Sequence, residues 1–290
     1  MTATATSTPH MSISTAHRSA SAASRTAFRA LLLRDLTVLR KNLKEFIPRT
    51  VLQPFMLCFV FLYVFPKIGT SVGGSGAAAS AFATVLVAGV VGLSIMFQGV
   101  QAVALPMVQE FGYTKEIEDR VLAPLPVSMV ALGKVTAGAL QCLLAGLIVF
   151  PIAAVVHAPG IHIHLQVHWL ESLTLIPMAC IMAASLGLTF GTRFDPRQVP
   201  NLFGIIILPL TFLGGTYYAW ARLEPIQVGG FSWLQALVCL NPLIYITEGF
   251  RAALTTTPHM HLYVIYPALV GWCALFLWMG MKGFKQRVLS

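Results

Sequence analysis

The chain has 290 residues, of which 57% are hydrophobic and only 10% are charged, and its mean hydropathy is +0.77. Soluble globular domains carry roughly 25% charged residues, so this composition excludes a water-soluble fold and indicates a surface that faces lipid. The net charge of +9 would suggest a nucleic-acid partner in a soluble protein. Here the cations flank apolar segments, so we expect no nucleic acid to bind.

The first 46 residues contain two segments with different predicted structures. Residues 1–25 are rich in Ser, Thr and Ala and contain no acid, which predicts a disordered cytoplasmic tail, with a transit peptide as the less favoured alternative. In residues 26–46, leucines recur every three or four positions and cations fill much of the remainder. This pattern predicts an amphipathic helix that lies in the membrane interface.

Six later segments have the length and hydropathy that a membrane crossing requires. They cover residues 48–68, 80–108, 129–156, 171–191, 198–217 and 262–282. The shorter stretch 231–250 is interrupted by Pro242, which favours a re-entrant or interfacial hairpin. The predicted fold class is therefore an all-α polytopic membrane protein with six transmembrane helices.

The distribution of cations predicts the orientation of these helices. If the N-terminus lies inside, 16 of the 19 Lys and Arg residues fall on or near cytoplasmic segments. Only Lys67, Arg222 and Arg251 fall outside. Because cytoplasmic loops of membrane proteins carry an excess of cations, we expect both termini to be cytoplasmic.

Polar chemistry inside the predicted spans is mild. The central portions carry side chains such as Gln98, Gln101, Gln141 and Thr189 but almost no charge, whereas ion-coupled carriers usually place ionisable groups there. The chain has no G-x-x-x-x-G-K-[ST] motif for ATP and no recognisable catalytic set. We therefore expect no catalytic residue, no cofactor bound by this chain, and an external source of energy for transport.

Small residues and cysteines within the spans predict packing. The pairs Ala88 with Gly92 and Gly187 with Gly191 occur at four-residue spacing, which allows close helix approach in lipid. All five cysteines lie in apolar segments without a C-x-x-C motif. We interpret them as buried thiols.

Two H-x-H pairs lie in the predicted outer loops. They are formed by His162 with His164 and by His259 with His261. Such pairs could bind a transition metal, but without further ligands in fixed geometry an exposed polar loop is the favoured interpretation. We therefore predict no metal site.

Acidic residues gather in the predicted cytoplasmic loop 109–128. Glu110, Glu116, Glu118 and Asp119 lie there, close to Lys115 and Arg120. A short charged helix in this position could dock a soluble partner, or it could be a solvated connection; the charge pattern alone leaves both open.

The order of these pieces resembles the membrane subunit of an ABC-2 type transporter. Three stretches carry the likeness: 116–128 followed by Lys134, 194–200, and 213–218 followed by 240–251. The resemblance covers about residues 26–290, which would form one ABC-2 type transmembrane domain.

The resemblance implies a role for two segments. The first cytoplasmic loop would couple to an ATPase through Glu110, Phe111, Gly112, Tyr113, Thr114, Lys115, Glu116, Glu118, Asp119 and Arg120. Residues 214–251 would form an outer re-entrant hairpin containing Gly214, Gly215, Asn241, Pro242, Glu248 and Arg251. Glu248 and Arg251, three residues apart, could pair near the outer surface; a helix-end ion pair of this kind would contribute little.

The resemblance also implies a function and partners. Such a chain would be the permease of an ATP-driven exporter in the inner membrane that moves a hydrophobic drug, a lipid-linked glycan or a lipo-oligosaccharide outward. A separate ATP-binding-cassette subunit would hold ATP and Mg²⁺, and a second permease copy would complete a dimer, with a homodimer favoured. The alternative is an ion- or proton-coupled secondary transporter of a small amphiphile.

Overall fold

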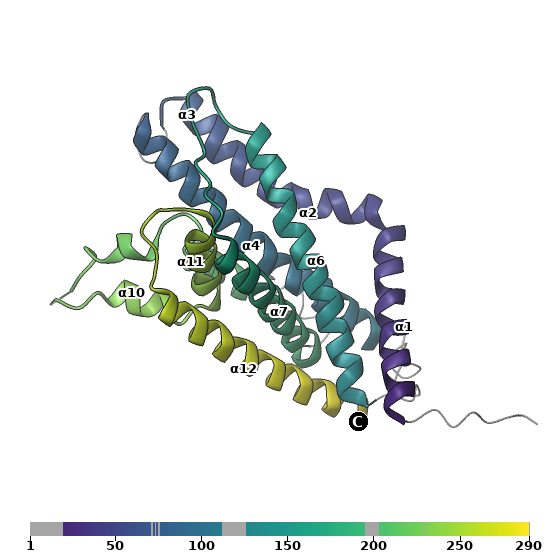
Figure 1. Ribbon diagram of the computed structural model, residues 1–290. Coiled ribbons are helices and arrows are strands. Elements are labelled where there is room, and N and C mark those ends of the chain that lie inside the picture. Colours follow the sequence, from purple (N-terminus) through teal and green to yellow (C-terminus); the bar gives the residue numbers. More distant parts are fainter. Residues whose placement is uncertain are drawn as a thin grey trace, which may run out of the picture.

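The computed structural model describes residues 20–70, 72, 74, 76–111, 126–194, 203–228 and 230–289. Within these ranges the chain is built from helices (Figure 1), and the only β-type contact is an isolated bridge between Val228 and Phe231. The all-α class predicted from the sequence is therefore confirmed.

Five helical stretches in the described ranges are long and apolar enough to cross a membrane. They are Leu43–Lys67, Ala77–Gln109, Val127–Val155, Trp169–Arg193 and Leu262–Val288. The first combines α2 (Leu43–Cys58), a π-helical segment (Phe59–Val64) and α3 (Phe65–Lys67). The others are α4 (Ala77–Gln109), α6 (Val127–Val155), α7 (Trp169–Arg193) and α12 (Leu262–Leu289).

The remaining predicted span, 198–217, is described only in part. A π-helical segment (Phe203–Ile207) leads into α9 (Leu208–Phe212), and residues 198–202 lie outside the described ranges. The helix ends five residues before the predicted boundary. The chain then turns at Gly215, whose φ of +66° is a conformation that other residues rarely adopt. A sixth crossing therefore stays a prediction.

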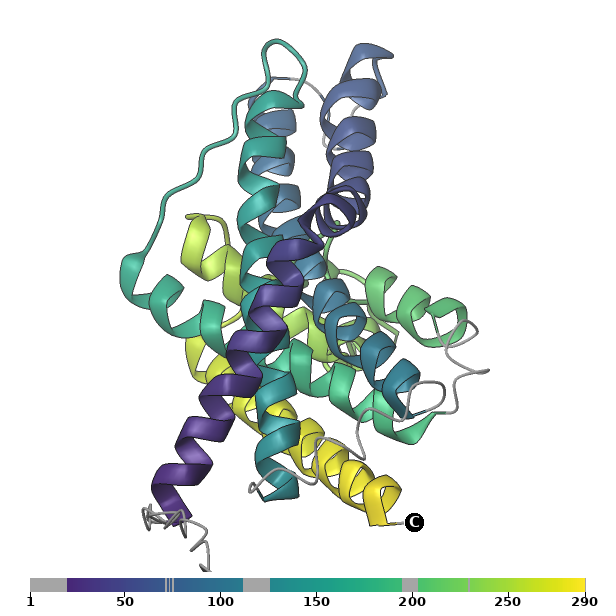
Figure 2. The same cartoon turned by 90° about the vertical axis from the view of Figure 1, so that its right-hand side faces the viewer.

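The N-terminal helix differs from its prediction in both bounds. Helix α1 spans Ala20–Lys41, so it begins six residues before the expected start and ends before Asn42 (Figure 1). Arg40 and Lys41 occupy its last turn, where cations interact favourably with the helix dipole. The chain changes direction at Asn42, and α1 packs beside α6, where Ser24 Oγ donates to Met129 Sδ at 3.3 Å (Figure 2).

Helix α4 is the centre of the bundle and contacts α2, α6, α7 and α11. Its closest approach is to α7: a Cβ on Gly99 would lie 2.4 Å from the Ala183 carbonyl carbon, and one on Gly187 would lie 2.3 Å from Gly99 O. A Cβ on Gly191 would lie 2.7 Å from Met107 Cβ. The predicted Gly187 and Gly191 pair therefore lies at a helix contact, but its partner Gly99 was not singled out by the sequence pattern.

Helix α7 in turn packs along α12. Thr189 Oγ1 donates to Phe276 O of α12 at 2.8 Å, so one of the mild mid-span polar groups joins two helices rather than facing a pathway. A Cβ on Gly283 would lie 2.7 Å from Thr192 Oγ1, which shows how closely the two helices run.

Candidate functional site

Helix α11 (Pro242–Leu254) is the short helix at the end of the predicted hairpin 214–251, and all 13 of its residues are buried. Its start is defined by Asn241, whose side-chain oxygen accepts from the Leu243 N–H at 2.9 Å, and by Pro242 at the first helical position. Both choices suit a helix N-terminus. At about 20 Å, α11 is too short to cross a bilayer, and it packs against α4, α7 and α12 instead.

The segment before α11 is bonded to it at several points. Asn241 Nδ2 donates to Leu210 O at 2.7 Å, and Thr247 Oγ1 donates to Gly214 O at 2.7 Å. A Cβ on Gly214 would lie 2.3 Å from the Leu243 side chain. The turn after α9 therefore lies directly on α11.

Glu248 and Arg251 form a buried ion pair on α11. Arg251 Nη1 donates to Glu248 Oε1 at 2.6 Å, and both side chains are 0% exposed. Arg251 Nη2 also donates to Gly215 O. Burial lowers the pKa of the Arg251 guanidinium from its ordinary value, and the Glu248 carboxylate opposes that shift.

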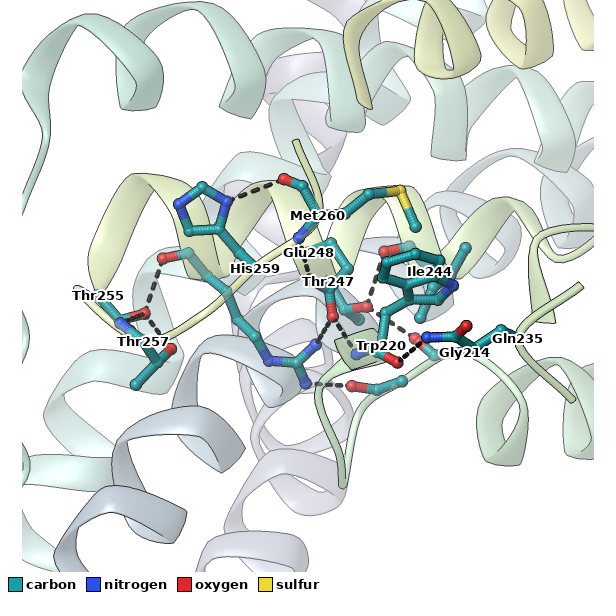
Figure 3. Close-up of polar contacts among 12 residues, drawn as sticks. Gly214, Trp220, Gln235, Ile244, Thr247, Glu248, Thr255, Thr257, His259 and Met260 are labelled. Atoms are coloured by element: carbon teal, nitrogen blue, oxygen red, sulfur yellow. Dashed lines mark hydrogen bonds and ion pairs between the residues drawn. The ribbon is translucent and has the colours of Figure 1, made fainter. Parts of the chain in front are cut away.

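The Glu248 carboxylate also gathers two backbone donors from separate parts of the chain (Figure 3). The Trp220 N–H donates to Oε1 at 2.8 Å, and the Met260 N–H donates to Oε2 at 2.8 Å. Trp220 begins the short 3₁₀ helix Trp220–Leu223, and Met260 precedes α12. The Glu248 carboxylate therefore connects three parts of the chain: the 3₁₀ helix at Trp220, α11, and the residues that precede α12.

The predicted pairing of Glu248 with Arg251 is confirmed, and Arg251 lies in the last turn of α11, but the pair is buried in the fold, and its position near the outer surface stays a prediction. The three-residue spacing predicts that the side chains meet. It carries no information on what covers them, and here the turn at Gly215 and the chain before α12 do so. The six residues expected in the hairpin lie around α11: Gly214, Gly215, Asn241, Pro242, Glu248 and Arg251.

The part of the predicted hairpin that precedes α11 extends away from the bundle (Figure 1). Beyond the 3₁₀ helix it contains α10 (Trp233–Val238). Gln235 Nε2 donates back to Trp220 O at 3.2 Å, so the two arms of the hairpin are joined across its base.

At the other end of α4, the structure describes only the first two residues of the predicted coupling loop. Lys134 Nζ of α6 lies 2.5 Å from Glu110 Oε1, and both side chains are buried. The Phe111 ring packs edge-on against Phe284 at 5.7 Å and lies 5.4 Å from the Arg287 guanidinium. The remaining predicted coupling residues, 112–116 and 118–120, lie outside the described ranges.

A polar cleft lies next to this pair, and three of the mid-span polar residues meet there. Thr50 Oγ1 donates to Gln98 Oε1 at 3.2 Å, Gln98 Nε2 donates to Gln141 Oε1 at 3.4 Å, and Arg49 Nε donates to Gln101 Oε1 at 2.6 Å. These bonds connect α2, α4 and α6. The sequence drew attention to the glutamines, but it gave no sign that Arg49 and Lys134 would join them.

The four histidines considered for a metal lie apart in two pairs. The His162 and His164 rings are 6.3 Å apart, and their backbone N–H groups donate to Ser80 Oγ and Thr84 Oγ1, each at 3.1 Å. His261 stacks on Tyr263, and His259 Nδ1 lies 2.9 Å from Met260 O. Among the described residues no three His, Cys, Asp or Glu side chains gather as metal ligands, and the five cysteines are free thiols.

Comparison with known families identifies this architecture. The model of the ABC-2 type transporter family matches residues 26–255, which is most of the chain. The chain belongs to the ABC-2 type transporter family. The expectation drawn from the sequence motifs is therefore confirmed.

Curated relatives agree with this membership. The ABC-2 chain is 28% identical over 210 residues to the inner membrane transport permease YadH of Escherichia coli K12, covering 70% of this chain and 74% of YadH. The same figures hold for YadH of Shigella flexneri. With its apolar helices, this ABC-2 permease is a multi-pass protein of the inner membrane, and its family generally acts with an ATPase subunit.

Proposed function

We propose that this permease is the membrane half of an ATP-driven exporter that moves a hydrophobic or amphiphilic substrate outward. The observation that supports it best is the chemistry of α4. This central helix has no charged residue along its 33 positions, so it offers no relay for protons or metal ions. This supports an energy source in another chain, in line with the family's association with ATPase subunits.

We infer that energy enters at the end of α4. The buried ion pair between Glu110 and Lys134 joins the end of α4 to α6, and the predicted coupling loop 109–128 connects these two helices in the sequence. A displacement of that loop by a bound ATPase would therefore act on two packed helices together. The acidic residues Glu116, Glu118 and Asp119 of the loop would meet cations on the partner.

The outer hairpin would close the pathway on the opposite side, as the family resemblance implies. The bonds from Glu248 to Trp220 and Met260 hold the hairpin base against α11. In a dimer of two such permeases, with two copies of this chain favoured, the two hairpins would lie over the outer end of the pathway.

The test uses the permease reconstituted in proteoliposomes together with the ATPase that co-purifies with it. Amphiphiles of the three substrate classes are screened for stimulation of ATP hydrolysis, with an ATPase variant lacking its P-loop lysine as the control. Stimulation by an amphiphile, followed by its ATP-dependent movement across the bilayer, is the expected result. Transport by the permease alone under a pH gradient would instead establish the alternative, a proton-coupled carrier.

A further inference from the structure

A cleft of about 630 Å³ lies between α1, α2, α4 and α6, at the end of the bundle where α4 ends and α6 begins. Amide side chains are concentrated in its lining: Asn42, Gln98, Gln101, Gln109 and Gln141. The chain has 13 Asn and Gln residues in total, so more than a third of its amides line this one cleft. Gln98 is buried, Gln101 and Gln141 are half-buried, and Asn42 and Gln109 are exposed at the rim, so the cluster offers hydrogen-bonding groups to a ligand that enters between the helices.

The charges that line the cleft sum to zero. The cations are Arg34, Arg49 and Lys134, and the acids are Asp35, Glu45 and Glu110. Lys134 is paired with Glu110, and Arg49 donates to Gln101. The described residues of the lining therefore carry no net charge with which to attract an anionic group.

The amides retain hydrogen-bonding capacity that faces the cleft. Each Gln side chain offers two N–H donors and two acceptor lone pairs. Gln98 uses one donor, towards Gln141, and accepts from Thr50. In the described part of the chain, Gln141 makes only the bond to Gln98. Paired donors and acceptors of this kind suit hydroxyl and amide groups.

The rest of the lining is apolar, and it is contributed by the same four helices. Its members are Val38, Leu39, Phe46, Ala102, Leu105, Pro106 and Ala137. A cleft that is polar on one part and apolar on another matches an amphiphile, with a polar head on the amides and an alkyl chain along the helices.

We infer that this cleft binds an amphiphile whose head is uncharged or zwitterionic and rich in hydroxyl or amide groups. The inference deepens the proposed function, on which it rests for the view that the bound molecule is cargo. It places the first binding step within a single permease chain, beside the buried pair at the start of the coupling loop.

The experiment measures binding without any ATPase or ATP. The permease is placed in nanodiscs of phosphatidylglycerol, whose anionic heads should not fill the cleft. Three probes with the same diazirine-bearing alkyl tail are photo-crosslinked to it: an alkyl maltoside, an alkyl phosphocholine and an alkyl phosphate. Peptide mass spectrometry then locates the labels.

The variants remove amides and leave the charges in place. Gln98→Leu with Gln141→Leu replaces both ends of one part-buried hydrogen bond, and it also removes the acceptor of the buried Thr50 hydroxyl, which lowers the stability of the fold. Gln109→Leu alters an exposed position on the cleft rim, and it keeps the test valid if the double variant does not fold. Gln53→Leu is the matched control, because Gln53 lies on α2 and does not line the cleft.

The maltoside probe, whose head is rich in hydroxyl groups, should label peptides of α1, α2, α4 and α6 at the cleft. The phosphocholine and phosphate probes, which lack such a head, should not. Each lost hydrogen bond should lower probe affinity roughly fivefold, and Gln53→Leu should leave it unchanged. Equal labelling by the phosphocholine or the phosphate probe, labels spread over the lipid-facing helices, or unchanged affinity in the amide variants would overturn the inference. Since no ATPase is present, failure here leaves the exporter proposal standing, and failure of ATP coupling leaves this binding result intact.

Discussion

Glu248 accepts from three donors that belong to different segments: the Arg251 guanidinium and the backbone N–H groups of Trp220 and Met260. Removing a carboxylate and a guanidinium from water costs several kcal/mol each, and the loss is recovered only when both groups find partners. Here every partner is a group of the folded chain. The buried pair is therefore stabilised only when the segments that carry Trp220 and Met260 lie beside α11.

Glu248→Gln is expected to lower the stability of the permease by about 3–5 kcal/mol, because it leaves the Arg251 guanidinium buried without a counter-charge. Thermal unfolding of the protein in nanodiscs measures the effect. Glu224→Gln is the control, since Glu224 lies exposed in the same hairpin and its change should be close to neutral.

The double variant Glu248→Gln with Arg251→Met removes both buried charges. It should be more stable than Glu248→Gln alone, because no uncompensated charge remains. A double variant that is less stable than either single one would show that the hydrogen bonds to the backbone matter more than the charges.

Lys134→Met is expected to destabilise the end of the bundle where α4 ends and α6 begins by a similar amount, about 3–5 kcal/mol, because Glu110 would lose the cation that lies 2.5 Å away. Hydrogen exchange over the last turns of α4 and the first turns of α6 should rise. Lys285→Met, at an exposed position of α12, supplies the comparison; equal exchange in the two variants would argue against a structural role for the pair.

At the scale of elements, the close contact between α4 and α7 depends on glycines, which have no side chain. Gly99, Gly187 and Gly191 bring α4 and α7 close enough that a Cβ at any of them would lie within 2.7 Å of the neighbouring helix. In lipid, where burial of apolar surface contributes little to helix association, such close packing is a main source of stability.

Gly99→Ala should therefore separate α4 from α7 and cost about 1–3 kcal/mol, the usual range for overpacking. Thermal unfolding again provides the measurement. Gly271→Ala on α12 is the matched control, because nothing lies within 4 Å of a Cβ placed there, and alanine should favour the helix by up to about 1 kcal/mol. Equal effects of the two changes would contradict the packing argument.

At the scale of the whole molecule, the positive-inside distribution predicts which end of the bundle faces the cytoplasm. The end formed by the C-terminal part of α4, the start of α6 and the C-terminus of α12 (Figure 1) carries Lys134, Lys282, Lys285 and Arg287. The hairpin at 220–238 would then face outward.

This orientation can be tested by labelling engineered cysteines in a variant whose native cysteines are replaced by alanine. Glu224→Cys should react with a membrane-impermeant maleimide in intact cells, and Lys285→Cys should react only after the membrane is opened. Both positions are exposed, so accessibility within the fold is matched. The reverse pattern of labelling would show that the orientation is opposite to the predicted one.

Reversing the charge of Glu116 and Glu118 to Lys tests the coupling loop. If the loop meets cations on the ATPase, co-purification should fall by at least about tenfold, because like charges replace complementary ones. Glu224→Lys, on the predicted outer side, should leave it unchanged. Retained ATPase binding with full transport would place the coupling surface elsewhere.

The sequence predicted the long helices well, since a membrane span is a local property of composition. The bounds of the segments 80–108, 129–156 and 171–191 lie within one to three residues of those of α4, α6 and α7. The predicted start of the last span, residue 262, coincides with that of α12, but the helix continues seven residues beyond 282. The first two helices were divided wrongly, because leucine spacing continues past Asn42 while the backbone turns there.

The sites were harder to predict, because their members are far apart in sequence. Glu248 and Trp220 are in contact although they are 28 positions apart in the sequence, and Thr50 and Gln98 although they are 48 positions apart. Hydropathy and spacing give no account of such contacts. A Gln in an apolar helix signals a buried polar partner, yet it does not identify that partner.

The complete burial of α11 has a consequence for how the protein is made. A helix with no lipid-facing side gains nothing from entering the bilayer by itself, and its neighbours α4, α7 and α12 lie on both sides of it in translation order. The first two emerge from the ribosome before α11, whereas α12 emerges after it. The surroundings of α11 are therefore incomplete when α11 is made, and one of its faces stays uncovered until the 28 residues of α12 have been synthesised. A nascent chain halted before residue 262 should accordingly be recognised by membrane quality control, whereas the full-length chain should escape it.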